Sequence, residues 1–452
     1  MEAIEQPFAT NVMFGGECQL TFNRTGDLLY HTYVLVDLWG IEACRAGVCT
    51  SGDTIPDGTN LFVGNYPGLP AANYCDPCND NPATGLTVNG PPASYPDGVE
   101  APWAHYTNSI GQWIVRRASI IIGGQVIDQL FSEYLFMWEE LSGKPGKRLE
   151  EMIGKDEKLE DLVANSMHDR RLYVPLPFWF SQPNGTGNAL PMVSLQFHGV
   201  QLSVCFQELS SCIQTSCARN EDGQMNSLYV IKRRSRQPIS DQDLRASVET
   251  TYVYLDIDER DRFATGAFEQ LICQTQVFTG SFRQSQVRVM LNFNHPMIEL
   301  IWAVRRQCMS HTNNHFAFDG RDGQDPIRAV SLKLNNLPRF SSREARYFRL
   351  VQPWMYHTNI PKHYIYCYSF ALYPEEPQPS GSCNFSRIDN VELVFEMQTG
   401  IDQFNEIGSI DPSTRGSCNI RGNTGEFTII VYGRSWNILR YREGLGGLAF
   451  SN

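Results

Sequence analysis

The sequence lacks the short motifs that mark the common enzyme classes. It contains no G-x-S-x-G nucleophile elbow, no G-x-x-x-x-G-K-[ST] phosphate loop, no H-E-x-x-H zinc motif and no Rossmann glycine pattern. Asp256, Asp258 and Glu259 could act as acid and base, but such charges are interpreted as solvated surface. His311 and His315 lie four residues apart in loop-like sequence and are only a weak candidate for a metal site. We therefore predict no catalytic site and no cofactor.

Membrane-spanning and strongly basic segments are also lacking. No run reaches the roughly 18 apolar residues of a membrane span. The start, MEAIEQPFATNVMF, is acidic and has no apolar core of a signal peptide, so we expect synthesis in the cytosol. The net charge of −12 argues against a general nucleic-acid binder, which needs a basic surface to release counterions. The longest basic run, 232–236, is interpreted as a solvated linker.

The 13 cysteines are an odd number, and most lie in strand-like sequence, where a buried thiol acts as a small apolar residue. One cluster differs, because Cys44, Cys49, Cys75 and Cys78 lie in a stretch rich in Gly, Pro, Asn and Asp. Their spacing suits a structural zinc site or two disulfides. A cytosolic setting disfavours disulfides. Four unlinked thiols remain an equal alternative to the zinc and disulfide readings taken together.

What the chain does contain is strand-forming sequence. Hydrophobic residues make up 42% and aromatics 12%, which is typical of a folded chain. The 25 Phe and 19 Tyr favour strands, and the 36 Gly and 25 Pro supply turns. At 452 residues the chain is long enough for two or three domains, each with its own core.

Two sequence patterns each occur twice along the chain, in the same order. SIIIGGQVID (119–128) and SLKLNNLPRF (331–340) each combine an alternating apolar strand with a tight Gly-Gly or Asn-Asn turn, which predicts a hairpin. LYVPLPFWFSQP (172–183) is then followed by a second strand segment, as is YIYCYSFALYP (364–374), at an offset close to that of the first pair. The repetition indicates a duplicated β domain. A doubled β sandwich is an assembly part more often than an enzyme.

The rest of the sequence divides the chain into two halves. We predict a first unit over 1–210, with a long loop at 39–102 and a helical excursion at 129–168. The polar, charged stretch 211–247 is predicted to be a linker, and 248–452 a second unit. Within the excursion, helices are expected at 130–141 and 148–167. A short helix is expected after Phe340, at the equivalent place in the second unit. Further polar loops are predicted at 305–326 and 400–425.

Seven strings resemble, in order, the major capsid protein of nucleocytoplasmic large DNA viruses. They are IIIGGQVIDQLFSEYLFMWEEL, RRLYVPLPFWF, ALPMVSLQFHGVQL, LDIDERDRFA, LNFNHP, QPSGSCNFSRIDN and the terminal NILRYREGLGGLAFSN. The resemblance spans almost the whole chain, and QPSGSCNFSRIDN and GLGGLAFSN are its most specific parts. It implies an all-β fold of two tandem eight-stranded antiparallel jelly rolls. It also implies homotrimers that form pseudo-hexagonal capsomers of an icosahedral shell.

The resemblance carries over to two groups of residues, for which we predict structural roles. Gly123 and Gly124 are expected to adopt positive φ in the turn that leads into the helical excursion. Arg387 and Asp389 are expected to pair across a turn, or Arg387 to bond backbone carbonyls. The full set of matching positions is Gly123, Gly124, Gln125, Asp128, Pro379, Gly381, Asn384, Arg387, Asp389 and Asn390.

The resemblance also implies binding partners and a location for the protein. Expected partners are further copies of the chain, penton and minor capsid proteins, and an inner membrane that lies close by without insertion, with assembly in the host cytoplasm. Two features depart from the family pattern. Met1 lies close to the first strand, where the family has a further segment, and the 39–102 loop is longer than in the chlorella virus type. We expect that loop at the exposed outer end of the capsomer.

Two alternatives are open from the sequence. A two-domain jelly-roll enzyme acting on glycans would need paired carboxylates in a cleft. A lectin-like binding module would need a shallow aromatic pocket. The string QPSGSCNFSRIDN favours neither.

Overall fold

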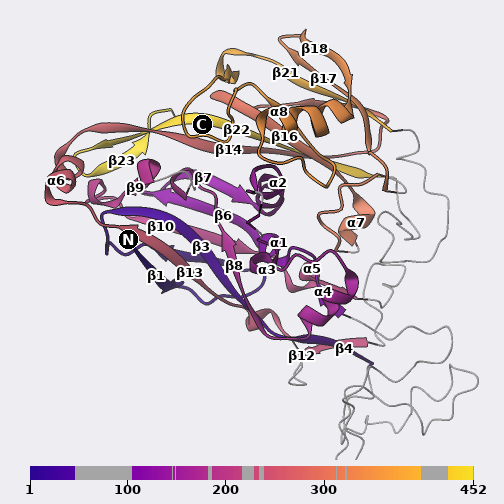
Figure 1. The fold of residues 1–452 in the computed structure, drawn as a ribbon, viewed down its shortest axis with the longest axis horizontal. Coiled ribbons are helices and arrows are strands. Elements are labelled where there is room, and N and C mark those ends of the chain that lie inside the picture. The colour runs from indigo at the N-terminus through magenta and orange to yellow at the C-terminus, as the bar shows by residue number, and fades with distance from the viewer. Residues whose placement is uncertain are drawn as a thin grey trace, which may run out of the picture.

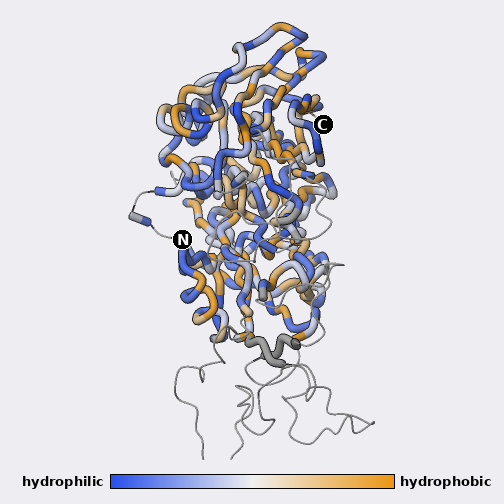
Figure 2. The backbone as a smooth tube through the Cα atoms, turned by 90° about the vertical axis from the view of Figure 1, so that its right-hand side faces the viewer, coloured by the Kyte–Doolittle hydropathy of each residue, from blue (hydrophilic) through white to orange (hydrophobic). Residues whose placement is uncertain are grey.

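The computed structural model describes residues 1–45, 104–144, 146–147, 149–181, 186–215, 229–233, 239–311, 313–320, 323–398 and 426–450. These residues form two β sandwiches stacked one on the other (Figure 1). The side view in Figure 2 shows the same stacking, with hydrophobic and hydrophilic residues alternating along the tube. Such alternation places one face of each strand in a core and the other outside it. No helix within the described ranges is long and apolar enough to cross a membrane.

The first sandwich consists of two antiparallel sheets. One has the order β1-β13-β3-β8, with β9 paired to β3, and the other has the order β2-β10-β6-β7. The strands of the first sheet are β1 (Glu2–Pro7), β13 (Arg245–Val253), β3 (Leu28–Leu38), β8 (Arg170–Pro175) and β9 (Leu190–Pro191). Those of the second sheet are β2 (Glu17–Thr21), β10 (Val200–Phe206), β6 (Val115–Ile122) and β7 (Gln125–Phe131).

The second sandwich repeats this plan strand for strand. Its sheets have the orders β14-β22-β16-β19, with β20 on β16 and β23 on β22, and β15-β21-β17-β18. The first contains β14 (Phe268–Phe282), β22 (Phe427–Arg442), β16 (Pro296–Arg306), β19 (Ile365–Ser369), β20 (Cys383–Asn384) and β23 (Leu445–Leu448). The second contains β15 (Gln286–Met290), β21 (Val391–Met397), β17 (Ile327–Leu334) and β18 (Leu337–Glu344). Four strands on the main path of each sheet give eight per sandwich, so the predicted double jelly roll is confirmed.

The chain passes between the sandwiches later than composition suggested. Strand β13 pairs with both β1 and β3 of the first sandwich. The crossover then runs through α6 (Ile257–Thr265) into β14. The predicted start of the second unit at residue 248 is therefore too early, because β13 continues to Val253 in a sheet of the first sandwich. Among the described residues of the predicted linker, 213–215, 229–233 and 245–247 lie in strands, so polar composition did not exclude strand pairing there.

Helical segments follow the same strand in both sandwiches. After β7 come α2 (Ser132–Ser142), α3 (Glu150–Ile153) and α4 (Leu159–Ser166). After β18 comes a helical run that begins as a π-helix, η6 (Tyr347–Val351), and continues as α8 (Gln352–Tyr356). The helix predicted at the equivalent place in the second sandwich is thus present. The helix expected from residue 130 begins two residues later, since β7 extends to Phe131 and pairs there with β6.

Shorter elements complete the described chain. Two-stranded pairs join β4 (Ile41–Arg45) to β12 (Tyr229–Arg233) and β5 (Ala104–Tyr106) to β11 (Ile213–Thr215). Short α-helices are α1 (Ile110–Ile114), α5 (Leu209–Cys212) and α7 (Gln307–His311). Single 3-10 turns are η1 (Trp179–Ser181), η2 (Thr186–Asn188), η3 (Met192–Ser194), η4 (Asp241–Asp243) and η7 (Phe385–Arg387).

The inner strands of the sheet β14-β22-β16-β19, β22 and β16, are buried on both faces along most of their length. One face, with Trp302 and Val431, packs inside the second sandwich. The other, with Ile301, Ala303 and Tyr432, joins the core of the first sandwich. Strand β16 is accordingly buried along most of its length, as expected of a strand with no solvent-facing side. The two sandwiches are thus held together through this sheet.

Candidate functional site between the two sandwiches

The junction between the sandwiches is made by β7 and α2 on one side and by β14, β22 and β16 on the other (Figure 1). Helix α2 has the acidic Glu133 in its first turn and ends at Gly143, whose N–H donates to Glu139 O. Its residues are buried on nearly every side, including Tyr134, Phe136 and Trp138. A helix buried to this extent requires cover on most of its faces. The second sandwich supplies part of that cover, through Tyr432 and Arg434.

Aromatic rings from both sandwiches meet at Tyr432 of β22. The ring centroid of Tyr134 lies 5.4 Å from that of Tyr432, and the centroid of Phe131 lies 6.2 Å from it. An ion pair of 3.2 Å between Arg305 Nη1 and Glu133 Oε1 adds a contact from β16 to the start of α2. Each aromatic pair contributes about 0.5–1.5 kcal/mol beyond the area that it buries.

Polar side chains join β7 to β14. Asp128 Oδ1 accepts a hydrogen bond of 2.9 Å from the Thr275 N–H. Gln274 Nε2 donates to Ile127 O, and Asn437 Nδ2 donates to Gln274 Oε1 at 2.8 Å. Burial raises the pKa of Asp128 to about 7, although hydrogen bonds from the Thr275 and Gln129 backbone partly oppose the rise. Asp128, predicted as a turn residue, is therefore a residue of the junction.

A buried ionic cluster lies next to these contacts. Arg434 Nη1 lies 2.6 Å from Glu299 Oε1 and donates to Pro374 O at 2.9 Å. The guanidinium also lies 3.8 Å from the centroid of the Trp138 ring, so an α2 residue covers its face. On the other side of Glu299, His357 Nε2 lies 2.9 Å from Oε2. The cluster thus links α2, β16, β22 and the end of α8.

The charges of this cluster stabilise one another. Burial alone would raise the pKa of Glu299, but His357 and then Arg434 outweigh it and lower that pKa to about 2. Burial would lower the pKa of His357, but Glu299 holds it well above its usual value. The ion pairs therefore remain charged at neutral pH. Removing one partner would leave a buried charge without its counter-charge, which is costly.

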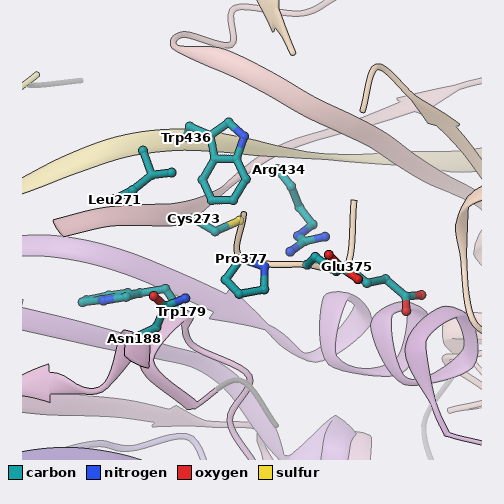
Figure 3. A pocket seen from close by; sticks show the side chains of 9 residues that line it. Trp179, Asn188, Leu271, Cys273, Glu375, Pro377, Arg434 and Trp436 are labelled. Carbon is teal, nitrogen blue, oxygen red and sulfur yellow. The ribbon is translucent and has the colours of Figure 1, made fainter. Parts of the chain in front are cut away.

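A small cavity opens beside the cluster (Figure 3). It is lined by Trp179 and Asn188 of the first sandwich and by residues of the second, among them Arg434 and Trp436. Its volume is about 10 Å³, room for roughly one water molecule. Ligand pockets typically measure about 300–1,000 Å³, so this cavity does not fit a sugar or a comparable substrate.

The two predicted hairpin turns have the same geometry. Gly123 and Gly124 have φ of 58° and 84°, as expected, and Asn335 and Asn336 have φ of 51° and 64°. Positive φ at both central residues matches the twist of the flanking strands. At Gly123 a Cβ would also lie 2.4 Å from His198 Nδ1. Gly123 is therefore required for space as well as for conformation.

Each turn is tied to the strand beside it in the same way. The Gly123 N–H donates to Gly199 O at 3.2 Å, and the Asn335 N–H donates to Asn390 O at 2.8 Å. Gly199 and Asn390 are the residues just before β10 and β21. The Asn390 N–H in turn donates to Asn335 Oδ1 at 3.1 Å. This pairing gives Asn390 a structural role at the turn.

The other motif residues of the second sandwich have local roles or lie on the surface. Gly381 has φ of 144°, and a Cβ there would lie 2.8 Å from Phe370 O. Asn384 Oδ1 accepts from the Ser386 N–H at 3.1 Å and so caps η7. Pro379, Arg387 and Asp389 are exposed. Within the described ranges, no ion pair joins Arg387 to Asp389 and neither bonds a carbonyl, so this expected contact is not seen.

Gln125 joins the two sandwiches at the far end of β7. Its Oε1 accepts, at 3.4 Å, from the N–H of Leu448 in β23. Like Asp128, it reaches the second sandwich from the hairpin identified in the sequence. Of the ten predicted positions, these two take part in the junction.

The candidate metal ligands are only partly accessible to structural description. Cys49, Cys75 and Cys78 lie outside the described residues, as does the side chain of Cys44, so the cysteine cluster stays a prediction. The side chain of His311 is outside them too. His315 is buried, stacks on Trp113 at 3.5 Å and has Nε2 2.9 Å from Ser211 O. In the part of the chain with assigned side chains, no cluster of potential metal ligands occurs.

Two family models match consecutive parts of the chain. The model for the major capsid protein N-terminus matches residues 86–256, and that for the large eukaryotic DNA virus major capsid protein matches residues 259–447. Together they cover well over half of the sequence. The chain belongs to the major capsid protein family of large eukaryotic DNA viruses. The gap between the two matches falls in the crossover after β13, where the sheets change.

Individual relatives agree with this assignment. The major capsid protein of Pyramimonas orientalis virus is 30% identical over 80% of this chain and 82% of that protein. That of Phaeocystis pouchetii virus is 27% identical over 100% of this chain and 93% of that protein. PBCV-1 VP54 has the same fold, with a TM-score of 0.68 at 23% identity over 100% of this chain and 96% of that chain. The Faustovirus major capsid protein gives 0.62 at 12% identity, over 98% and 90%.

This capsid protein is therefore a structural component of a virion and not an enzyme. The glycan-acting enzyme considered from the sequence is excluded by the family assignment. As a capsid protein it assembles with further copies of itself. The junction described above shapes the unit that assembles.

Sequence reasoning missed the ionic cluster. Glu299 and Arg434 are the lone charges in the apolar segments PMIELIWAV and TIIVYGRSW. A single charge within a strand that is otherwise apolar indicates a buried ion that needs a partner. That signal could have identified Glu299 and Arg434 but not their pairing, and nothing local marks His357.

Proposed function

We propose that three copies of this capsid protein form a pseudo-hexagonal capsomer that tiles the icosahedral shell of a large DNA virus. The observation that carries the proposal is the repetition of one sandwich plan, strand for strand, within a single rigidly joined chain. Three such chains supply six similar sandwiches, which gives nearly sixfold edges for lattice contacts. Closed cyclic symmetry is the usual outcome for assemblies of identical chains.

The buried junction supports this function. A lattice unit must keep a fixed angle between its sandwiches, and the shared core with Tyr432 and the Arg434–Glu299 pair fixes that angle. A flexible linker between two independent domains would not. The predicted 39–102 loop begins later than expected, because Ile41–Arg45 form β4 and pair with β12. In this proposal the loop after β4 lies at the exposed end, penton and minor capsid proteins are further partners, an inner membrane lies nearby, and assembly takes place in the host cytoplasm.

Native mass tests the proposal. We expect light scattering of the purified chain to give about three times the chain mass of 51.2 kDa, and negative-stain images to show pseudo-hexagonal particles. A monomer at all concentrations tested would contradict the trimer. Particles with clear twofold outlines would contradict the pseudo-hexagonal capsomer even if the chain self-associates.

A further inference from the structure

The segment that follows α7 belongs to the second sandwich by sequence but lies in the core of the first. Its residues 313–318 come after β16 and α7, and all of them except Asn314 are buried. Phe316 and Phe318 belong to the apolar core of the first sandwich. Figure 1 shows α7 extending from the second sandwich towards α5 of the first. We call residues 313–318 the latch.

Asn313 is the polar centre of the latch. Its Nδ2 donates to Ser210 O and to Ile213 O, each at 2.7 Å. Its own backbone O accepts from Thr107 Oγ1 and from Gln214 Nε2, each at 2.6 Å. All four partners lie in the first sandwich, either just after β5 or in α5 and β11. We call these four residues the socket.

The backbone and burial of Asn313 fit this contact. Its φ is 58°, in the left-handed region that Asn enters more readily than most residues. Asn313 is only 3% exposed, so its amide needs partners within the protein. If the latch moved away, the carbonyl groups and the hydroxyl of the socket would lose these partners as well. The socket is therefore complementary to a segment of the other sandwich.

Aromatic rings continue the contact on either side of Asn313. His315 stacks on Trp113 of α1 with 3.5 Å between centroids, and Phe316 stacks on Phe136 of α2 at 4.2 Å. His315 Nε2 also lies 2.9 Å from Ser211 O. Trp113 and Phe136 are themselves buried. The latch thus completes both the polar and the apolar packing at this end of the first sandwich.

The latch is a second attachment between the sandwiches, separate from the shared sheet. It contacts α1, α5 and β11, whereas the shared sheet meets β7 and α2 through Tyr432. In Figure 1, α7 and α5 lie at one end of the molecule and β23, which bonds to Gln125, lies at the other. A single contact between two bodies allows them to pivot about it. A further contact at a distance removes that freedom.

We propose that the latch is a conformational lock, which opens and closes as a unit independently of the shared sheet and fixes the angle between the sandwiches when closed. Folded proteins open locally in contiguous units of this kind. The socket precedes the latch in the chain, so the first sandwich is synthesised before the segment that completes it. A subunit with an open latch has both sandwiches formed but can pivot. The lock belongs to the single chain and does not rest on the proposed trimer.

An isosteric substitution tests the polar centre of the latch. Asn313→Asp replaces the amide donor by a carboxylate that faces two carbonyl oxygens. We expect hydrogen exchange, followed by mass spectrometry, to become at least about tenfold faster in peptides covering 104–107 and 209–215, because the latch opens there. Peptides covering β22 should exchange as in the parent. The matched control is Asn314→Asp, which makes the same change at the neighbouring exposed residue and should leave both regions unchanged.

A second substitution tests whether the latch moves as a unit. Phe316→Ala removes the ring that stacks on Phe136 and leaves the hydrogen bonds of Asn313 in place. The same socket peptides should exchange faster. Phe197→Ala, at a residue that is 75% exposed, is the control and should have no effect there. If the Asp variant does not fold, Asn313→Gly removes the same side chain without strain at positive φ and gives the same measurement.

Small-angle X-ray scattering tests the fixed angle. At equal native mass, the Asn313→Asp protein should show a broader distribution of interatomic distances than the Asn314→Asp protein, because its sandwiches pivot. Superimposable curves from two proteins that differ in socket exchange would overturn the fixed angle.

The remaining outcomes are equally decisive. Unchanged exchange in the socket would show that the latch does not hold it, and equal acceleration in β22 would show that latch and shared sheet open together. Responses to Asn313→Asp and Phe316→Ala in different regions would show that the latch is not a unit. Each of these results overturns the inference. Native mass reports on the trimer separately, so a failure of the proposed function leaves these tests intact.

Discussion

The two sandwiches share one strand order but differ in how their corresponding surfaces are buried. Helix α2 is enclosed between sandwiches, whereas α8 has an open apolar face. The covering sheet of the second sandwich presents Ile301, Ala303 and Tyr432 to its neighbour, whereas the first sandwich presents charged and half-buried side chains. The difference teaches that identical topology does not require identical chemistry. A contact that forms once during folding can be apolar. Surfaces that meet only when folded chains associate are exposed to water beforehand and must be compatible with it.

The largest expected effect comes from exchanging the two tryptophans for alanine. Trp138→Ala should lower the free energy of unfolding by about 4 kcal/mol, because it leaves a cavity and uncovers Arg434. Trp354→Ala should change it by less than about 0.5 kcal/mol, since Trp354 is exposed. Urea unfolding of both proteins as monomers, checked by light scattering, provides the comparison. Equal losses would show that the two helices do not differ in burial.

Breaking the buried ion pair should cost slightly less. Arg434→Met leaves Glu299 buried with only His357 as partner, and we expect a loss of about 3 kcal/mol in unfolding free energy. The matched control is Arg440→Met on the same strand, which breaks a pair with Glu269 in which both side chains are more than half exposed. That pair should contribute less than about 1 kcal/mol. A similar loss in both variants would contradict the special role of the junction.

Local chemistry explains what the sequence predicted well. The Gly123-Gly124 and Asn335-Asn336 turns, and the helices that follow, depend on residues adjacent in the chain. The pairing of β13 with β1 does not depend on adjacent residues, because β1 lies at the opposite end of the first sandwich's sequence. The predicted boundary between the two units was therefore wrong. The ionic cluster joins Glu299, Arg434 and His357 from separate elements, and no local pattern fixes such a meeting. Only the lone charges in apolar strands hint at it.

The two hairpin turns give a smaller, graded effect. Gly124→Ala should cost about 1 kcal/mol, because φ is positive but a Cβ would meet nothing within 4 Å. Gly123→Ala should cost at least about 2 kcal/mol, since its Cβ would also displace the His198 ring. Asn335→Gly, in the second turn, should change stability by only a few tenths. Thermal unfolding ranks the three, and a milder effect at Gly123 than at Gly124 would refute the steric argument.

A separate expected effect is a change in pH dependence at the junction. Asp128 has a folded pKa of about 7, above its usual value of 3.8, so the folded protein binds the proton more tightly than the unfolded chain. The contribution of this group to stability is therefore present below about pH 4 and is lost as pH rises toward 7. Asp128→Asn keeps an oxygen acceptor for the Thr275 N–H but does not titrate. Urea midpoints between pH 5 and 8 should fall less steeply in the variant, whereas Asp389→Asn, an exposed control, should follow the parent. Parallel curves for all three proteins would mean that Asp128 does not titrate within the folded junction.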